Sequence, residues 1–185
     1  MGIEAVILTG GGSRRMGRDK ATLPIDGKAQ AQRIVDSLRA EGIAVTTLGR
    51  EPTPGAAFIA DQEEFAGPIA ALSCFEPRED KVFVGSCDLP RFDPRLVRLL
   101  AECFEGDACV PVSDGFRQPL CALYASLAFG ELQAMTEEGL RCPTKWLDRL
   151  KVRLVLEEEL IRLGGNPDWT RGANTPEELA RLIEC

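Results

Sequence analysis

The stretch that decides the fold covers residues 4–20 and reads Glu4-Ala-Val-Ile-Leu-Thr-Gly-Gly-Gly-Ser-Arg-Arg-Met-Gly-Arg-Asp-Lys20. It opens with a short apolar run that ends at glycine, which predicts a buried strand of a parallel sheet. The three successive glycines let the backbone approach a ligand closely and turn its amides toward that ligand. The loop carries one acidic side chain and four basic ones: Arg14, Arg15, Arg18 and Lys20. A basic, glycine-rich loop in an acidic protein suits a polyphosphate.

Two familiar phosphate-binding patterns do not fit this loop. The dinucleotide fingerprint GxGxxG would need a third glycine at position 15, which is Arg15. A Walker A loop that starts at Gly12 reaches Gly17, but then continues with Arg-Asp in place of Lys-Ser/Thr. The other interpretation, a surface turn with a solvated basic cluster, is disfavoured because glycines and cations coincide at one strand end.

The overall composition predicts a globular protein of one domain, residues 1–185. Of its side chains, 44% are hydrophobic and 28% are charged. With 22 basic and 29 acidic residues the net charge is −7, so we expect no nucleic-acid partner. The sequence contains no histidine, which excludes every mechanism that uses a histidine base, nucleophile or zinc ligand.

The same sequence predicts a cytoplasmic location and no membrane contact. Its start lacks the features of a signal peptide, and no apolar run approaches the roughly 20 residues of a membrane span. The seven cysteines form no CxxC pair, and we expect them to be reduced thiols.

Apolar runs and helical periodicities alternate along the rest of the chain. Strands are expected at residues 4–9, 43–48, 56–60, 81–86, 108–112, 120–124 and 152–156. Helices are expected near residues 31–38, 67–75, 94–104, 126–138 and 143–150, and after the capping box Thr175-Pro-Glu-Glu178. This alternation predicts an α/β fold with a mostly parallel central sheet and helices on both faces. Ligands of such folds bind beyond the carboxyl ends of the strands.

Asp88 is the first candidate site residue outside the loop. It lies in Val84-Gly-Ser-Cys-Asp-Leu-Pro90, directly after a predicted buried strand. A carboxylate there could hold Mg²⁺ against phosphate oxygens, since magnesium prefers few carboxylates plus substrate oxygens. The alternative is an aspartate that caps the turn before Pro90. Beside a triphosphate loop, the metal interpretation is favoured.

Asp61 is the second candidate, because it follows another short strand and could accept a hydrogen bond from a ribose hydroxyl or a base. A solvated acidic loop is the alternative interpretation. Gly67-Pro68 could bring the start of a helix near the nucleotide. The stretch Arg117-Gln-Pro-Leu-Cys-Ala-Leu-Tyr124 could face a second substrate or be an ordinary core strand.

Together these residues resemble the molybdenum cofactor guanylyltransferases, a family of MobA-like nucleotidyltransferases. The loop from Leu8 to Lys20 is similar to the family pattern LxGGxSxRMGxDK. Gly67-Pro-Ile-Ala-Ala-Leu72 resembles its GPLAGL segment, and Cys87-Asp-Leu-Pro90 its CDxP. Gln118-Pro-Leu-Cys-Ala-Leu-Tyr124 resembles QPLxALY, and Asn174-Thr-Pro-Glu-Glu-Leu179 resembles the terminal NTPEEL. The first motif is shared with other nucleotidyltransferases, whereas the whole set in this order is much more specific.

The resemblance implies a Rossmann-like nucleotidyltransferase fold. It also implies transfer of GMP from GTP to the phosphate of molybdopterin or Mo-molybdopterin, with release of pyrophosphate. Carried over by position, Leu8, Thr9 and Gly10 would contact GTP and Lys20 would meet its phosphates. Asp61 would contact the nucleoside, and Asp88 the nucleotide and Mg²⁺. Two positions depart from the asparagines that some members carry: Gly49, after the second strand, and Gly172.

In-line attack of one phosphate on another needs positioning and charge neutralisation, and no strong base. We assign Lys20 and Arg15 to the triphosphate and the leaving pyrophosphate. The amides of Gly10, Gly11, Gly12 and Ser13 would supply fixed dipoles.

Several other functions stay open. The chain could be a molybdopterin cytidylyltransferase or another cofactor or sugar-phosphate nucleotidyltransferase. It could also be a nucleotide-binding cofactor chaperone without turnover or, less favoured, a hydrolase. Transient contact with molybdoenzyme apoproteins or other proteins of cofactor biosynthesis is a further expectation.

Overall fold

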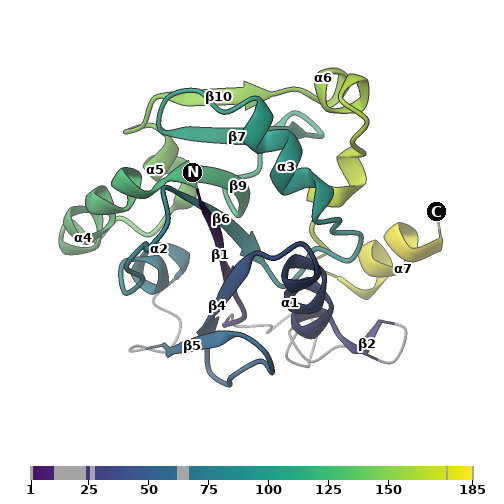
Figure 1. The fold of residues 1–185 in the computed structure, drawn as a ribbon, viewed down its shortest axis with the longest axis horizontal. Helices are drawn as coiled ribbons and strands as arrows, with labels where there is room; N and C mark the ends of the chain where they lie inside the picture. The colour runs from purple at the N-terminus through teal and green to yellow at the C-terminus, as the bar shows by residue number, and fades with distance from the viewer. Residues whose placement is uncertain (1, 11–23, 26–27, 62–66, 174, 185) are drawn as a thin grey trace.

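The computed structural model describes residues 2–10, 24–25, 28–61, 67–173 and 175–184. Their main element is a twisted sheet with the strand order β10-β7-β9-β6-β1-β4-β5 (Figure 1). Its strands are β1 (Ile3–Leu8), β4 (Ala44–Gly49), β5 (Ala57–Ala60), β6 (Lys81–Ser86), β7 (Ala108–Ser113), β9 (Cys121–Ala125) and β10 (Val152–Val155). The short β8 (Phe116–Arg117) pairs with β7, and β2 (Pro24–Ile25) pairs with β3 (Lys28–Ala29).

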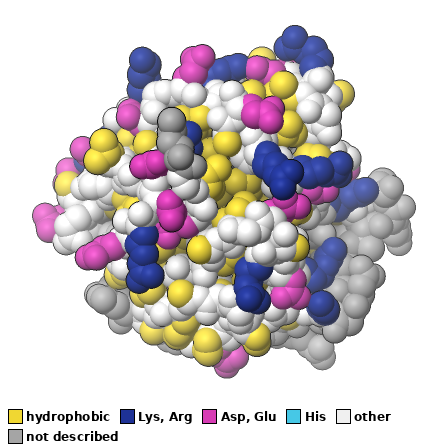
Figure 2. Space-filling view, in the orientation of Figure 1, with side chains coloured by type: hydrophobic (Ala, Val, Ile, Leu, Met, Phe, Trp, Pro, Cys, Tyr) yellow, Lys and Arg dark blue, Asp and Glu magenta, His cyan; other side chains and the backbone are white. Residues whose placement is uncertain are grey.

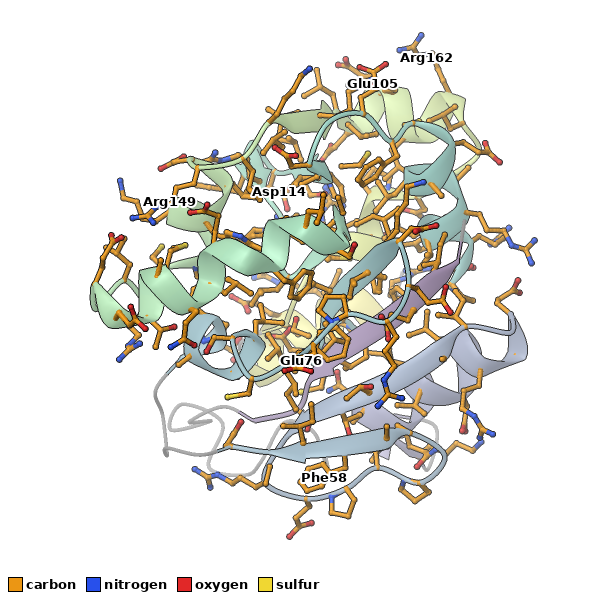
Figure 3. All side chains as sticks on the ribbon, turned by 60° about the vertical axis from the view of Figure 1, so that its left-hand side comes forward. Phe58, Glu76, Glu105, Asp114, Arg149 and Arg162 are labelled. Carbon is orange, nitrogen blue, oxygen red and sulfur yellow. The ribbon has the colours of Figure 1, made fainter. Side chains whose placement is uncertain are left out.

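Of the seven strands in this order, all but β9 run in the same direction. Strands β1, β4, β5 and β6 pair in parallel, as do β7 and β10, whereas β9 runs antiparallel to both β6 and β7. Figure 3 shows the two margins of the sheet, with Phe58 on β5 at one margin and Glu105 and Arg162 near the other. The predicted mostly parallel α/β sheet is therefore confirmed.

Helices cover both faces of the sheet, as the sequence predicts (Figure 1). On one face lie α1 (Gln30–Ala40), α3 (Arg95–Glu102) and α6 (Glu157–Arg162), which pack side chains such as Leu38, Leu100 and Leu160 onto the sheet. On the other lie α2 (Pro68–Leu72), α4 (Gly130–Glu137) and α5 (Pro143–Leu147), with Leu72, Leu132 and Trp146. Each face of the sheet thus has its own apolar core.

The C-terminal helix α7 (Pro176–Glu184) begins with the predicted capping box. The backbone N–H of Glu178 donates to the Thr175 hydroxyl over 3.1 Å, and the Glu178 carboxylate accepts from the Thr175 N–H over 3.2 Å. This reciprocal pair satisfies backbone donors that a helix start leaves without partners.

Some elements differ from the sequence-based expectation. The segment expected as one helix at 126–138 begins as a 3₁₀ turn, Ser126–Phe129, before α4 starts. Helix α6, the 3₁₀ turn Pro167–Thr170 and the two-residue strands are not predicted from the sequence. These elements are short, so hydrophobic periodicity has too few residues in which to appear.

The surface carries both signs of charge. Figure 2 shows Lys and Arg side chains interleaved with Asp and Glu over the face in view, with apolar side chains between them. Among the helices of the described residues, none is both long and apolar enough to cross a membrane.

Candidate functional site

The register of the parallel strands brings four strand ends to one edge of the sheet. Leu8, the last residue of β1, pairs with Leu48 of β4 and with Ser86 of β6. Gly49 of β4 pairs with Ala60 of β5. Residues that follow these strands therefore lie side by side at the carboxyl edge, where open α/β sheets bind ligands. Both predicted carboxylates, Asp61 and Asp88, are among them.

The start of the glycine loop is held tightly against β4. The backbone N–H groups of Thr9 and Gly10 both donate to the carbonyl of Leu48, over 2.7 and 3.2 Å. The Thr9 hydroxyl donates to the same oxygen over 3.0 Å, and Thr9 is buried. These three hydrogen bonds fix the direction in which the chain leaves β1.

Gly49 and Gly10 are glycines for a steric reason. A Cβ atom on Gly49 would lie 2.2 Å from the Thr9 hydroxyl and 2.8 Å from the Gly10 nitrogen. A Cβ atom on Gly10 would lie 2.2 Å from a carboxylate oxygen of Asp61. The departure at Gly49 therefore has a physical cause, because no side chain fits between these two strand ends without moving the backbone.

Asp61 lies against the glycine loop. Its backbone N–H donates to the Gly49 carbonyl over 2.9 Å, and its carboxylate packs against the Cα of Gly10. Burial raises the pKa of the Asp61 carboxyl, while the positive charge of Arg50 opposes that rise. The result is a carboxylate that is partly desolvated beside the loop and suited to accept a hydrogen bond from a ligand.

Asp88 is fixed from two directions. The Ser86 hydroxyl donates to its Oδ1 atom, and the neighbouring Cys87 N–H donates to the Leu8 carbonyl over 3.0 Å. From the C-terminal part of the chain, the Ala173 N–H donates to the Asp88 carbonyl over 2.9 Å. Ser86 is not among the residues predicted from the sequence, although its place at the end of a buried strand is the same signal that pointed to Asp88.

The donors at this edge fit magnesium bound together with a nucleotide. In the described part of the chain, no group of three or more His, Cys, Asp or Glu side chains could form a metal site by itself. Magnesium in nucleotide sites commonly takes one or two carboxylates plus phosphate oxygens and water. A single firmly held carboxylate such as Asp88 matches that arrangement.

Five predicted site residues lie outside the described residues: Gly11, Gly12, Ser13, Arg15 and Lys20. The described Leu8, Thr9 and Gly10 form the base of that loop, and Leu8 itself is a core residue. The roles assigned to the five residues therefore stay predictions.

The predicted stretch 117–124 divides into two parts. Tyr124 is fully buried, stacks on Trp146 with 4.2 Å between ring centroids, and donates its hydroxyl hydrogen to the Pro119 carbonyl over 2.8 Å. That end is core. Gln118 instead lies at the carboxyl edge, where its amide donates to the carbonyls of Ser113 and Phe116.

An ionic network at the same edge is not predicted from the sequence. Arg171 donates hydrogen bonds to the carboxylates of Asp114, Glu157 and Asp168. No local pattern could have revealed it, because Asp114 is 57 positions away from Arg171 and Glu157 is 14 positions away.

Comparison with known proteins decides the family. Residues 5–153 match the MobA-like NTP transferase domain. The chain belongs to this family. A molybdenum cofactor guanylyltransferase from Rhizobium meliloti is 31% identical over 192 residues, which cover 95% of this chain and 88% of that protein. A probable molybdenum cofactor guanylyltransferase from Pelotomaculum thermopropionicum is 32% identical, covering 95% of this chain and 89% of the relative.

Two further relatives show the fold and how much of each protein the match covers. The solved structure of molybdopterin-guanine dinucleotide biosynthesis protein A from Archaeoglobus fulgidus has a TM-score of 0.80 and 26% identity, covering 98% of this chain and 97% of that one. The chain also matches a molybdenum cofactor biosynthesis bifunctional protein from Synechocystis at 26% identity, but spans only 52% of its length. The predicted family and nucleotidyltransferase fold are confirmed.

Proposed function

We propose that this protein transfers GMP from GTP to the phosphate of molybdopterin, or of Mo-molybdopterin, and releases pyrophosphate. The observation that carries the proposal is that Asp61 and Asp88 flank the base of the glycine loop along one sheet edge, in a chain of the MobA-like family. The names of its relatives supply the guanine nucleotide and the molybdopterin acceptor.

The chemistry asks for positioning more than for a base. The attacking phosphate is already ionised at neutral pH, so the absence of histidine from the sequence is no obstacle. Thr9 and Gly10 hold the start of the loop whose amides, with Lys20 and Arg15, would neutralise the triphosphate and the leaving pyrophosphate. Asp61 would accept a hydrogen bond from the nucleoside.

Asp88 would hold Mg²⁺, with its carboxylate kept in place by the Ser86 hydroxyl. Magnesium, when bound, acts as a Lewis acid that neutralises phosphate charge and orients the reacting groups. We further propose that the protein works in the cytoplasm and that its contacts with apoenzymes or other biosynthetic proteins are transient.

The test is to incubate the protein with molybdopterin, Mg²⁺ and each nucleoside triphosphate in turn, following pyrophosphate and the dinucleotide product. We expect turnover and the tightest binding with GTP. Turnover with CTP alone would favour the cytidylyltransferase. That alternative stays open because Gly49 stands where some members of the family carry an asparagine. Binding of GTP without release of pyrophosphate would instead support a non-catalytic carrier, and equal affinity for all four nucleotides would contradict guanine selectivity.

A further inference from the structure

The C-terminal segment 170–173 contacts Asp88 through Gly172 and Ala173. Besides the hydrogen bond from the Ala173 N–H to the Asp88 carbonyl, Gly172 lies so close that a Cβ atom there would be 3.5 Å from Asp88 Oδ1. Ala173 is buried. Gly172 and Ala173 therefore help to position Asp88, the candidate magnesium ligand.

Arg171 anchors that segment to three other parts of the fold. It forms a two-pronged pair with Asp114, with both N···O distances at 2.9 Å, and contacts Glu157 at 3.2 Å and Asp168 as well. Asp114, which is labelled in Figure 3, lies in the turn between β7 and β8, and Glu157 is the first residue of α6. The bidentate geometry of arginine with a carboxylate fixes orientation as well as distance.

The register of the sheet shows why this anchor reaches Asp88. Val82 of β6 and Ala108 of β7 both pair with Tyr124 of β9, so β6 and β7 run level with each other. Asp88 lies six residues after Val82, and Asp114 lies six residues after Ala108, so these two aspartates are also level. Two strand spacings separate β6 from β7, or about 10 Å. The chain from Arg171 to Gly172 bridges that gap, touching Asp114 at one end and Asp88 at the other.

The network is more than a solvated surface ion pair. Arg171 is about one quarter exposed and has three acidic partners, whereas an isolated exposed pair contributes little. Asp114 adopts a left-handed backbone conformation with φ of 53°, and its own N–H donates to Glu157 over 2.7 Å. Asp168 also lies 3.8 Å from Arg91, which follows Asp88 in the chain. The turn at Asp114, the start of α6 and the loop after Asp88 are therefore linked by one network of charged side chains.

We propose that Arg171 is a positioning residue, which holds segment 170–173 so that Asp88 is presented to the nucleotide and its metal. The proposal rests on the proposed function for the role of Asp88, and it adds a residue that does not itself touch the reacting groups. Removing Arg171 should loosen the Ala173–Asp88 contact and weaken the use of Mg²⁺, while GTP binding through the glycine loop changes less.

The experiment compares Arg171→Met and Arg171→Lys with the matched control Arg149→Met. Arg149 also forms ion pairs with two carboxylates, Glu131 and Glu138. These two residues belong to α4 and its C-terminal cap, and not to the network of Arg171. We expect Arg171→Met to lower kcat roughly 10-fold or more and to raise the Mg²⁺ concentration for half-maximal rate, with little change in KM for GTP. The kcat of Arg171→Lys should lie between those of Arg171→Met and the wild type, because one ammonium group cannot reproduce the two-pronged hydrogen bonding of a planar guanidinium.

A readout without substrate makes the test independent of turnover. In the unliganded protein, hydrogen exchange at the Ala173 amide should speed up at least several-fold in Arg171→Met and stay unchanged in Arg149→Met. Asp114→Asn keeps the left-handed turn, which asparagine adopts readily, and should speed exchange in the same direction by less. If the Arg171→Met protein folds too poorly to assay, the Asp114→Asn variant decides the question.

Two results would overturn the proposal: wild-type exchange at Ala173 in both Arg171→Met and Asp114→Asn, or an equal loss of kcat in Arg149→Met. Failure of the proposed function looks different. Wild-type protein without guanylyl transfer would reject that function, and the Ala173 exchange rates would then decide alone whether Arg171 holds the segment against Asp88.

Discussion

Asp88 is the residue whose replacement most directly tests the metal assignment. Asp88→Asn keeps the size of the side chain and an oxygen for the Ser86 hydroxyl, but removes the negative charge. Because magnesium binds through charge and strict oxygen geometry, we expect at least about a 100-fold loss of guanylyl transfer. Activity across a magnesium titration, with thermal melts alongside, is the measurement. Wild-type activity at low magnesium would leave Asp88 as a turn cap, since asparagine caps nearly as well.

Gly49 provides a steric prediction. In Gly49→Asn the new side chain must displace the Thr9 hydroxyl and the Gly10 nitrogen, so we expect a loss of about 1–3 kcal/mol in unfolding free energy. Chemical denaturation measures it. Gly130→Ala is the matched control, because nothing lies within 4 Å of a Cβ atom there, and its stability should change by less than about 1 kcal/mol. A Gly49→Asn variant as stable as the wild type would show that the strand ends can separate.

Asp61 couples stability to pH. Burial raises its pKa above the ordinary 3.8, so the folded state binds a proton more readily than the unfolded state. Its contribution to stability therefore decreases as pH rises from below 3.8 through the folded pKa. At neutral pH, Asp61→Asn should raise the Tm of the nucleotide-free protein slightly and weaken GTP binding, and the gain in Tm should vanish at acid pH.

Thermal melts across pH and calorimetric titration with GTP check both parts of this prediction. Glu51→Gln, an exposed acid near the same strand ends, is the control and should leave GTP affinity unchanged. Wild-type GTP affinity in the Asp61→Asn variant would remove Asp61 from the nucleotide site.

At the scale of the element, α7 depends on its cap more than on packing. Most of its described side chains are exposed, and the Arg91 guanidinium holds it by donating to the Leu182 carbonyl over 3.3 Å. Thr175→Ala removes the acceptor for the Glu178 N–H and should cost about 1 kcal/mol of helix stability. We expect faster amide exchange confined to α7 with a nearly constant Tm. Glu177→Gln in the same turn is the control, and a large global drop in Tm would mean that α7 folds with the core.

At the scale of the whole molecule, burial controls access to the cysteines. Burial raises the pKa of the Cys109 thiol to about 12 and raises that of Cys121 as well. Cys142 is exposed, and its hydrogen bond with the Thr144 hydroxyl lowers its pKa, which increases the reactive thiolate near neutral pH. Among the described cysteines, alkylation of native protein should therefore label Cys142 first, and should label Cys109 and Cys121 only on unfolding.

Mass spectrometry of alkylated peptides measures this order, with protein in denaturant as the control in which all thiols react. Labelling of Cys121 as fast as Cys142 in native protein would indicate that the sheet opens far more often than its fully buried core suggests.

Local signals in the sequence predicted the elements that recur with a clear period. Residues 81–86 were expected as a buried strand and form β6, and Gly67-Pro68 marks the start of α2. The capping box at Thr175 was likewise predicted from residues four positions apart or less. Asp61 and Asp88 could be named because each follows such a strand, and parallel strands bring their carboxyl ends to one edge. The sequence by itself thus determined the class of fold and the edge that carries the candidate site.

Only the tertiary structure decided which distant groups touch at that edge. The clash that keeps Gly49 a glycine comes from Thr9, which directly follows the neighbouring strand β1, and it depends on the register between β1 and β4. Segment 170–173 can join Asp114 to Asp88 because β6 and β7 run level and the chain returns to this edge after α6. Periodicity and capping are properties of neighbouring residues, whereas these contacts exist only after the sheet has fixed its strand order and register.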